Sequence, residues 1–195
     1  LLIFDWDGTI SDSLDHIVRS MRYAIEKLEF PQKEDDAIRN IIGLGLEEAL
    51  DRLFPGIEAG QCKKMVSHYR EYYLSTSADS INLFPGVEET IKLLHENGLS
   101  LAVATGKSRR GLDRALQKSG LHGYFHYSRC ADETISKPHP QMLQEIMDFF
   151  AIEPKKVMMI GDSEHDLQMA INAGVASAAV TYGAQNREYL LKFEP

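Results

Sequence analysis

The sequence predicts an α/β fold, with a parallel sheet as the core and an all-helical segment inserted after the first strand. Three observations predict it. Short apolar runs alternate with helical patterns from residue 87 onward, which is typical of βαβ units. A first apolar run, Leu1-Leu2-Ile3-Phe4, is separated from the others by a long helical block. Polar side chains directly follow the apolar runs, as expected where ligands bind at the carboxyl edge of a parallel sheet.

Length and composition are those of one globular core with a small accessory unit. The chain has 195 residues, of which 44% are hydrophobic and 26% charged, and its net charge of −8 argues against nucleic acid as a partner. No apolar run approaches the roughly 20 residues that span a membrane, and no signal peptide is expected. Cys62 and Cys130 lie far apart, which favours reduced thiols and a cytoplasmic location.

The inserted segment, residues 13–80, is predicted to be an all-helical cap. Its first helix begins at Leu14, after three candidate N-caps, and ends before Phe30-Pro31. Apolar side chains recur in it at helical spacing: Leu14, Ile17, Val18, Met21, Ile25 and Leu28. Two further helices are expected over residues 46–53 and 59–74.

The rest of the chain predicts a Rossmann-like core domain made of residues 1–12 and 81–195. In order, the patterns predict a helix over 87–96, a strand over 99–104, a helix over 107–119 and a short strand over 125–130. A helix over 140–150, a strand over 156–160, a helix over 163–173 and a last strand over 175–180 follow. Glycines close three of these helices, at Gly98, Gly120 and Gly174.

The residues that follow the predicted strands suit phosphoryl transfer. They are Asp5 and Asp7, then Thr105, Gly106 and Lys107, then Asp132 and Lys137, and finally Asp162 and Asp166. Clustered carboxylates bind Mg²⁺, and a lysine and a hydroxyl can neutralise or hydrogen-bond phosphoryl oxygens. A carboxylate close to both can attack phosphorus and form an aspartyl-phosphate. Gly8 and Gly106 are expected to let the backbone approach the phosphate.

Four segments carry a resemblance to a known family. "FDWDGT", "VATGK", "SKPHP" and "GDSEHD" are similar to motifs one to four of the haloacid dehalogenase-like (HAD) hydrolase superfamily, in the same order. The resemblance covers the whole chain. The insertion between motifs one and two resembles the C1 cap of subfamily IA, in the branch of phosphoglycolate phosphatase and β-phosphoglucomutase. The resemblance implies a HAD-like fold and a phosphoric monoester phosphatase.

The resemblance also implies a role for each motif residue. Asp5 is the nucleophile, and Asp7 is the general acid and then the base, with its backbone carbonyl facing Mg²⁺. Thr105 binds the phosphoryl group, Lys137 bridges that group and Asp5, Asp162 binds the metal, and Asp166 holds the metal shell directly or through water. The expected metal set is Asp5, Asp7, Asp162 and Asp166. The expected phosphate- or substrate-binding set is Trp6, Gly8, Gly106 and Lys107.

Asp7 narrows the expected reaction. An aspartate two positions after the nucleophile resembles phosphatases and mutases, whereas dehalogenases and P-type ATPases of the superfamily lack it. Asp7 must hold a proton at one stage, and we expect closure of the cap to supply that environment. The prediction is a Mg²⁺-dependent phosphomonoester hydrolase for a small phosphorylated metabolite, working as a monomer or weak homo-oligomer, without nucleic acid or membrane.

Two alternatives stay open at this point. A β-phosphoglucomutase-like mutase usually offers an arginine from the cap turn, where this chain has Gly43-Leu44-Gly45; Arg39 is a possible substitute. His16 lies one residue from the expected mutase position and is interpreted as a helix-surface or hinge residue. A receiver-type protein accepts phosphate on an aspartate after its third strand and has no cap, so it fits less well.

Several side chains have two interpretations. The Trp6 ring packs beside its motif, or it contacts the cap or substrate. Arg109-Arg110 is a solvated helix start, or it contacts the substrate after the Thr105 loop. Tyr69, Tyr72 and Tyr73 are interpreted as cap packing rather than as a stack against the substrate.

Overall fold

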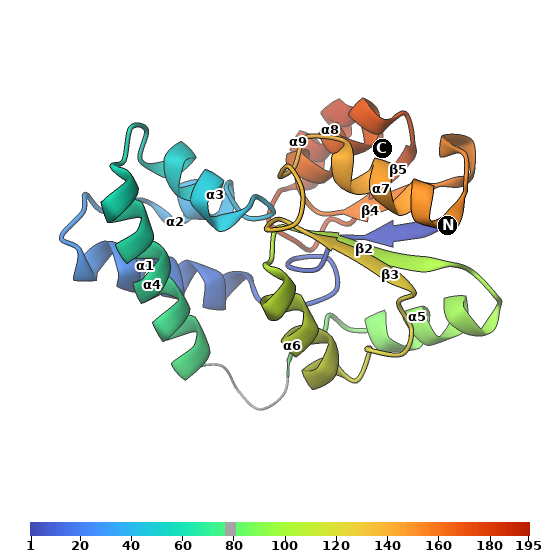
Figure 1. The fold of residues 1–195 in the computed structure, drawn as a ribbon, viewed down its shortest axis with the longest axis horizontal. Helices are drawn as coiled ribbons and strands as arrows, with labels where there is room; N and C mark the ends of the chain where they lie inside the picture. The colour runs from blue at the N-terminus through green and yellow to red at the C-terminus, as the bar shows by residue number, and fades with distance from the viewer. Residues whose placement is uncertain (77–80) are drawn as a thin grey trace.

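The core of the protein is a five-stranded parallel sheet with the strand order β3-β2-β1-β4-β5 (Figure 1). The computed structural model describes residues 1–76 and 81–195. In the middle of the sheet, Phe4 of β1 pairs with Val103 of β2 and with Ile160 of β4. The strands are β1 (Leu2–Phe4), β2 (Leu101–Thr105), β3 (Tyr127–Cys130), β4 (Met158–Gly161) and β5 (Ala176–Ala179). The predicted parallel α/β core is confirmed.

Helices cover both faces of this sheet. Helices α5 (Val87–Glu96) and α6 (Arg109–Ser119) lie below it in Figure 1, and α7 (Gln141–Phe150) and α8 (Glu164–Ala173) lie above it. Alternate residues of β2 point to opposite faces. Val103 therefore packs in the hydrophobic cluster that contains Leu112 of α6, and Ala102 packs in the one that contains Ile146 of α7. A short helix α9 (Arg187–Leu190) lies near the C-terminus.

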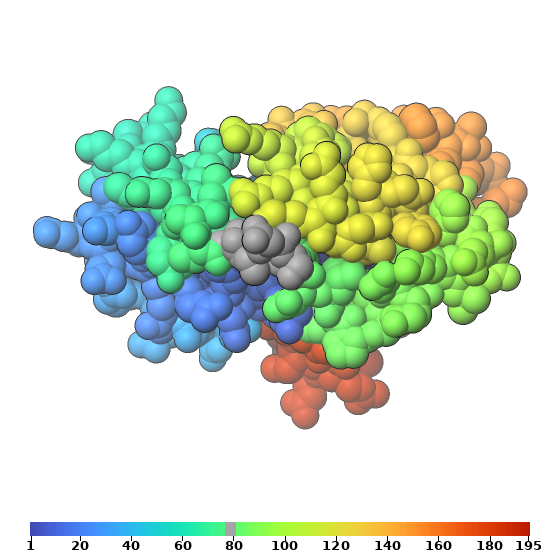
Figure 2. Space-filling view, turned by 90° about the horizontal axis from the view of Figure 1, so that it is seen from below, coloured from blue at the N-terminus to red at the C-terminus, as the bar shows by residue number. Residues whose placement is uncertain are grey.

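Four helices between β1 and α5 form a cap with a hydrophobic cluster of its own. They are α1 (Leu14–Lys27), α2 (Asp35–Arg39), α3 (Leu46–Leu53) and α4 (Ala59–Ser75). Met21, Ile25, Leu50 and Met65 are almost completely buried among them. Figures 1 and 2 show the cap, blue to green, packed beside the core. The expected end of the cap at residue 80 lies outside the described residues.

The elements that the sequence analysis missed are short. Helix α2 has five residues and α9 has four, and two 3₁₀ turns cover Pro154–Lys156 and Leu191–Phe193. One turn of helix shows too few apolar repeats to reveal a period of 3.6 residues, since Ile38 is the only buried residue of α2. Among the described residues, no helix combines the length and the apolar character needed to cross a membrane.

Candidate active site

Strand β1 ends at a buried ion-pair network. Asp5 follows the strand directly, and its Oδ1 accepts a hydrogen bond from Nζ of Lys137 at 2.7 Å. The same Nζ donates to Oδ1 of Asp166 at 2.6 Å, and all three side chains are buried. Burial alone would lower the pKa of Lys137, but the two carboxylates raise it overall. Lys137 is therefore a fixed cation between two acids.

Three buried carboxylates converge at this point. Asp5, Asp162 and Asp166 each offer an oxygen, and these oxygens lie within 4.8 Å of one another. Asp162 is oriented by the Thr9 hydroxyl, which donates to Oδ1 at 2.9 Å, and by the backbone N–H of Ala184, which donates to Oδ2 at 2.7 Å. These bonds fix the direction of the carboxylate in advance of any ligand.

Asp166 is held by its own helix start. Its Oδ2 accepts the backbone N–H of Ser163 at 3.1 Å and the Ser163 hydroxyl at 2.7 Å, as part of a capping box at the beginning of α8. Since Oδ1 is bound to Lys137, both oxygens of Asp166 already have protein donors. The local sequence "GDSEHD" thus places one acid at the end of β4 and a second acid one turn into α8.

The donor set at these carboxylates fits a divalent cation. Oδ2 of Asp5 is buried and has no hydrogen-bond partner among the described residues, which is a costly state for a carboxylate oxygen. Burial raises the pKa of Asp5 well above its usual range; Lys137 opposes this shift, and Asp166 and Asp162 add to it. Burial and the neighbouring Asp166 raise the pKa of Asp162 to about 7. A hard cation such as Mg²⁺ prefers such oxygens and would offset their repulsion.

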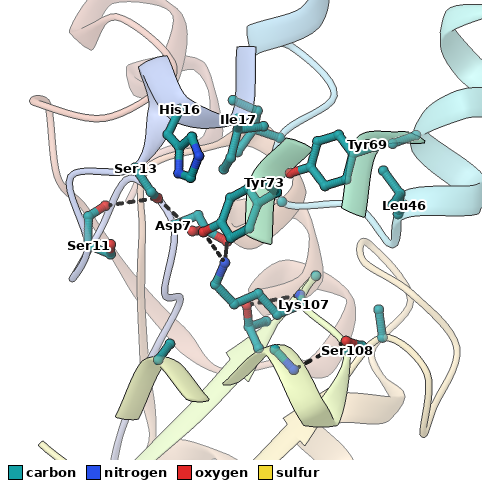
Figure 3. Close-up of a pocket in the computed structure, with 18 of the residues that line it drawn as sticks. Asp7, Ser11, Ser13, His16, Ile17, Leu46, Tyr69, Tyr73, Lys107 and Ser108 are labelled. Atoms are coloured by element: carbon teal, nitrogen blue, oxygen red, sulfur yellow. Dashed lines mark hydrogen bonds and ion pairs between the residues drawn. The ribbon is translucent and has the colours of Figure 1, made fainter. Parts of the chain in front are cut away.

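Asp7 faces a different neighbourhood from the acidic group. The Ser13 hydroxyl donates to its Oδ1 at 2.6 Å, and Nζ of Lys107 lies 2.9 Å from its Oδ2 (Figure 3). Nζ of Lys107 also donates to the hydroxyl of Tyr73 at 3.3 Å. Burial alone would lower the pKa of Lys107, but Asp7 beside it raises it overall. The side chain of Asp7 is thus outside the three-carboxylate group, and the ligand role expected for its backbone carbonyl stays a prediction.

Two glycines of the motifs make room for other parts of the site. Gly8 has a φ of +85°, and a Cβ at this position would lie 2.7 Å from Cγ of Asp162. A Cβ on Gly106 would lie 2.5 Å from the carbonyl oxygen of Gly43 in the cap. The structure therefore gives both glycines a packing reason, while their expected contact with phosphate stays a prediction.

Thr105 is the last residue of β2 and is buried next to Gly106. Its hydroxyl accepts the backbone N–H of Lys107 at 3.2 Å, which folds the loop between β2 and α6 into a tight turn. The hydroxyl hydrogen stays available for an acceptor such as a phosphoryl oxygen. Thr105 and Lys107 both line the cavity described below.

The Trp6 side chain does not lie in the site, which corrects the interpretation of its ring as a substrate contact. It is completely buried and packs edge-on against Phe125 at 6.4 Å between ring centroids. Trp6 follows Phe4 by two residues, so both side chains point to the same face of the sheet, and both belong to the cluster that contains Leu112. Only the backbone of Trp6 is left for binding phosphate.

A cavity of about 1010 Å³ lies between cap and core. The core lines it with Asp5, Asp7, Thr105 and Lys107, and the cap covers these residues with side chains of α1 and α4, among them His16, Ile17, Tyr69 and Tyr73 (Figure 3). The His16 ring stacks on Tyr73 at 4.3 Å. His16 and Tyr73 therefore face the cavity, and the interpretation of His16 as a surface residue and of Tyr73 as simple packing is incomplete.

The turn Gly43-Leu44-Gly45 docks directly on the core loops. The backbone N–H of Gly45 donates to Oγ of Ser136 at 2.8 Å, and all three residues of the turn line the cavity. Arg39, the possible substitute for a mutase arginine, instead binds Asp15 and is not among the residues that line the cavity.

Three functional neighbours carried weak sequence signals. Thr9 follows the acidic pair in motif one, but its bond to Asp162 joins residues 153 positions apart. Ser13 resembled a helix N-cap; it does precede α1, yet its hydroxyl binds Asp7 rather than the helix backbone. Tyr73 lies on the cap, and no pattern in the chain links it to Lys107.

Comparison with known proteins places these motifs in a family. The model of the family described as haloacid dehalogenase-like hydrolase matches residues 2–180 of the chain. The chain is 36% identical to the "Probable phosphatase IndB" of Dickeya dadantii, over 100% of this chain and 86% of the relative. It is 32% identical to "Pyrophosphatase PpaX" of Halalkalibacterium halodurans, over 100% of this chain and 89% of the relative.

The fold is similar to that of solved structures. A crystal structure of a "predicted phosphoglycolate phosphatase" from Haemophilus somnus matches with a TM-score of 0.89 and 26% identity, over 100% of this chain and 91% of that one. The similarity includes both the sheet and the cap, because it extends over the whole chain.

Proposed function

The chain belongs to the haloacid dehalogenase-like hydrolase family, as a phosphatase of its phosphoglycolate phosphatase-like branch. Within that branch, we propose that it is a Mg²⁺-dependent phosphomonoester hydrolase for a small phosphorylated metabolite. The reaction proceeds through an aspartyl-phosphate on Asp5. One observation carries the proposal. Oδ2 of Asp5 is a buried carboxylate oxygen that has no hydrogen-bond partner in the described part of the chain, and it lies at the edge of a cavity beside two further acids.

The reaction divides into two displacements. An oxygen of Asp5 attacks phosphorus, and the bond to the substrate's alcohol oxygen breaks while that oxygen takes a proton from Asp7. Water then attacks the aspartyl-phosphate and gives a proton to the Asp7 carboxylate, which releases phosphate and restores Asp5. Lys107 and Ser13 hold Asp7 in place for both proton transfers. Thr105 and Lys137 supply a hydrogen bond and a positive charge to the phosphoryl oxygens.

The metal belongs to the same proposal. Asp5, Asp162 and Asp166 would hold it, with the backbone carbonyl of Asp7 as a further ligand. When bound, Mg²⁺ supplies positive charge that offsets the repulsion between the phosphoryl group and the buried carboxylates. The cap excludes bulk water from the cavity, so that its opening and closing can admit water between the two steps.

Release of phosphate from a panel of metabolites tests the proposal. The panel holds phosphoglycolate, sugar phosphates, nucleoside monophosphates, pyridoxal phosphate and pyrophosphate, each assayed with Mg²⁺ and with EDTA. We expect release that requires Mg²⁺ and that falls by at least about a thousandfold in Asp5→Asn, because the amide is a poor nucleophile.

The matched control is Asp148→Asn, an exposed aspartate of α7 outside the cavity lining. It should keep full activity. Equal activity of Asp5→Asn and the parent would overturn the nucleophile assignment. Absence of release from every compound, with isomerised sugar phosphate formed from a bisphosphate-primed reaction, would favour the mutase instead.

A further inference from the structure

The arginines of the chain fall into two groups. Of the ten arginines, five form ion pairs with carboxylates: Arg22, Arg39, Arg52, Arg109 and Arg129. The other five have no carboxylate partner among the described residues, and four of these line the cavity that holds Asp5 and Asp7: Arg19, Arg70, Arg110 and Arg114. In a chain with a net charge of −8, this concentration of unpaired cations points to an anionic ligand.

Arg110 and Arg114 lie on the core side of the cavity, on one face of helix α6. They are four residues apart, so their side chains are neighbours, about 6 Å apart along the helix axis. The helix begins two residues after Lys107, which contacts Asp7. The two arginines therefore follow the loop of Thr105 and Lys107 along α6, in the lining of the same cavity.

Arg109 shows the contrast within the same helix. Its guanidinium donates to both oxygens of Glu133, at 3.0 and 2.8 Å, and to the hydroxyl of Ser128 at 2.8 Å. Arg109 therefore links α6 to β3 and to the loop after β3, and it does not line the cavity. The open interpretation of Arg109-Arg110 thus resolves into a structural Arg109 and a cavity-facing Arg110.

The cap contributes the remaining two cations. Arg19 lies one turn after His16 on α1, and Arg70 lies on α4. Two carboxylates of the lining have partners of their own: Asp15 is paired with Arg39, and Oδ1 of Asp132 accepts the backbone N–H of Arg109. The acidic residues Glu47 and Glu48 of the lining belong to α3, an element that carries none of these four arginines.

From this placement, we propose that Arg110 and Arg114 bind a second anionic group of the substrate, so that the preferred substrates carry a carboxylate or a further phosphate beyond the phosphoryl group that is transferred. The inference rests on the proposed function, because it names the substrate class of that same site. A guanidinium matches either anion with two parallel hydrogen bonds. Arg19 and Arg70 add positive charge from the cap when it covers the substrate.

Esters that share one carbon chain test this directly. Phosphoglycolate, ethylene glycol bisphosphate and hydroxyethyl phosphate are phosphate esters with two carbon atoms. At the end opposite the ester they carry a carboxylate, a phosphate and a neutral hydroxyl, respectively. A second series with a longer carbon chain carries the same three end groups. We expect kcat/KM to be at least about tenfold higher for one or both anionic esters than for the neutral one. Comparison of the two anions decides which of them the arginines take.

The variants assign that preference to the arginines. In Arg110→Gln/Arg114→Gln the preference should fall to less than about threefold, mainly through a higher KM for the anionic esters. The matched control is Arg187→Gln, an exposed arginine of α9 outside the cavity, which should keep the parent's preference. A parent enzyme without preference, or a double variant that keeps it, overturns the inference while hydrolysis itself stands.

Binding without turnover separates the two proposals. Calorimetric titration of Asp5→Asn with the same esters should show the same preference for an anionic far end, and the arginine double variant in that background should lose it. This outcome supports the subsite even if no ester of the panel is hydrolysed, which would overturn the proposed function alone. Equal affinity for the anionic and neutral esters overturns the subsite.

Discussion

At the scale of single residues, the site is defined by an imbalance of buried charge. Asp5, Asp162 and Asp166 converge near the ammonium group of Lys137, and one carboxylate oxygen of Asp5 has no partner within residues 1–76 and 81–195. Burial of such groups disfavours their ionised forms, as the raised pKa values of Asp5 and Asp162 express. Under the proposed function, protons and a divalent cation would therefore compete for the same oxygens.

This competition predicts opposite pH dependences for the metal-free and metal-bound protein. The pKa of Asp162 rises from 3.8 to about 7 on folding, so between these pH values the folded state keeps a proton that the unfolded state has released. The free energy of unfolding of the metal-free protein should therefore decrease from about pH 4 to about pH 7, by an amount of order 2 to 4 kcal/mol. Bound Mg²⁺ requires the ionised carboxylates, so its stabilisation should increase over the same range.

Thermal unfolding with EDTA and with Mg²⁺, at about pH 5 and about pH 8, measures both effects. The rise in Tm caused by Mg²⁺ should be larger at the higher pH. In Asp162→Asn the metal-free protein should lose part of this pH dependence, because the amide does not titrate, whereas Asp5, whose pKa is also raised, still does. An equal shift in Tm at the two pH values would contradict the assignment of the acidic group as the metal site.

At the scale of elements, the site is assembled from loops that fit closely. The loop between β2 and α6 approaches the turn between α2 and α3 so closely that Gly106 has no room for a side chain. Gly45 of the same turn binds Ser136 in the loop before Lys137. These contacts join motifs two and three to the cap. The position of the turn Gly43-Leu44-Gly45 therefore depends both on the loop after β2 and on the loop that leads to Lys137.

Replacing Gly106 by alanine should separate the cap turn from the core. Its Cβ would lie 2.5 Å from the carbonyl oxygen of Gly43, and backbone atoms cannot rotate away as a side chain does. We expect kcat/KM for phosphate release to fall by about tenfold or more, because misplacement of the loop disturbs Thr105 and Lys107. Steady-state kinetics measure the loss, and circular dichroism checks that the variant is folded.

Gly60→Ala is the control for this substitution. Gly60 lies in α4 with no atom within 4 Å of a built Cβ. Alanine there should leave activity unchanged and stabilise the protein by up to about 1 kcal/mol, because it favours the helix. Full activity of Gly106→Ala would show that the close contact has no part in forming the site.

At the scale of the whole molecule, the candidate active site lies in a cavity between two hydrophobic bodies, the cap and the core. The cap has its own cluster around Met21 and Leu50, and the core has clusters on both faces of the sheet. Polar contacts join the two bodies: Arg52 pairs with Glu164 at 3.0 Å, and Nε2 of His165 donates to the carbonyl oxygen of Asn40 at 3.0 Å. The structure therefore shows the cap docked on the core, with exposed polar pairs among the contacts that hold it there.

Weakening the Arg52–Glu164 pair should favour the open arrangement. The Arg52 side chain is 53% exposed, so the pair contributes about 0.2 to 1 kcal/mol, and Arg52→Ala should raise KM by no more than about fivefold with little change in stability. Small-angle scattering of the ligand-free variant should give a larger radius of gyration than the parent. The charge-swapped variant Arg52→Glu/Glu164→Arg should restore part of the effect. An unchanged KM together with an unchanged radius would contradict a role for this pair in closure.

The sequence by itself determined the layers of the fold and the chemistry of the motifs. Apolar runs and helical periods predicted every strand and the long helices, with α5 and α3 placed at their observed bounds, because burial on a sheet or a helix face imposes a local period. The position of Asp5, Thr105, Lys137 and Asp162 after strands followed from the same local rule, since parallel strands share one carboxyl edge. Of the two interpretations of the Trp6 ring, packing beside its motif is the one that the structure shows, in line with its alternation with Phe4.

Only the tertiary structure decided which side chains meet. Asp7 pairs with Lys107 and Ser13 rather than joining the other acids, Tyr73 reaches the same lysine from the cap, and Arg110 but not Arg109 faces the cavity. These contacts join residues far apart in the chain, and each depends on how the cap packs on the core. The periods of a sequence describe burial along one element, whereas the pairing of polar groups depends on distances across elements, which no local pattern records.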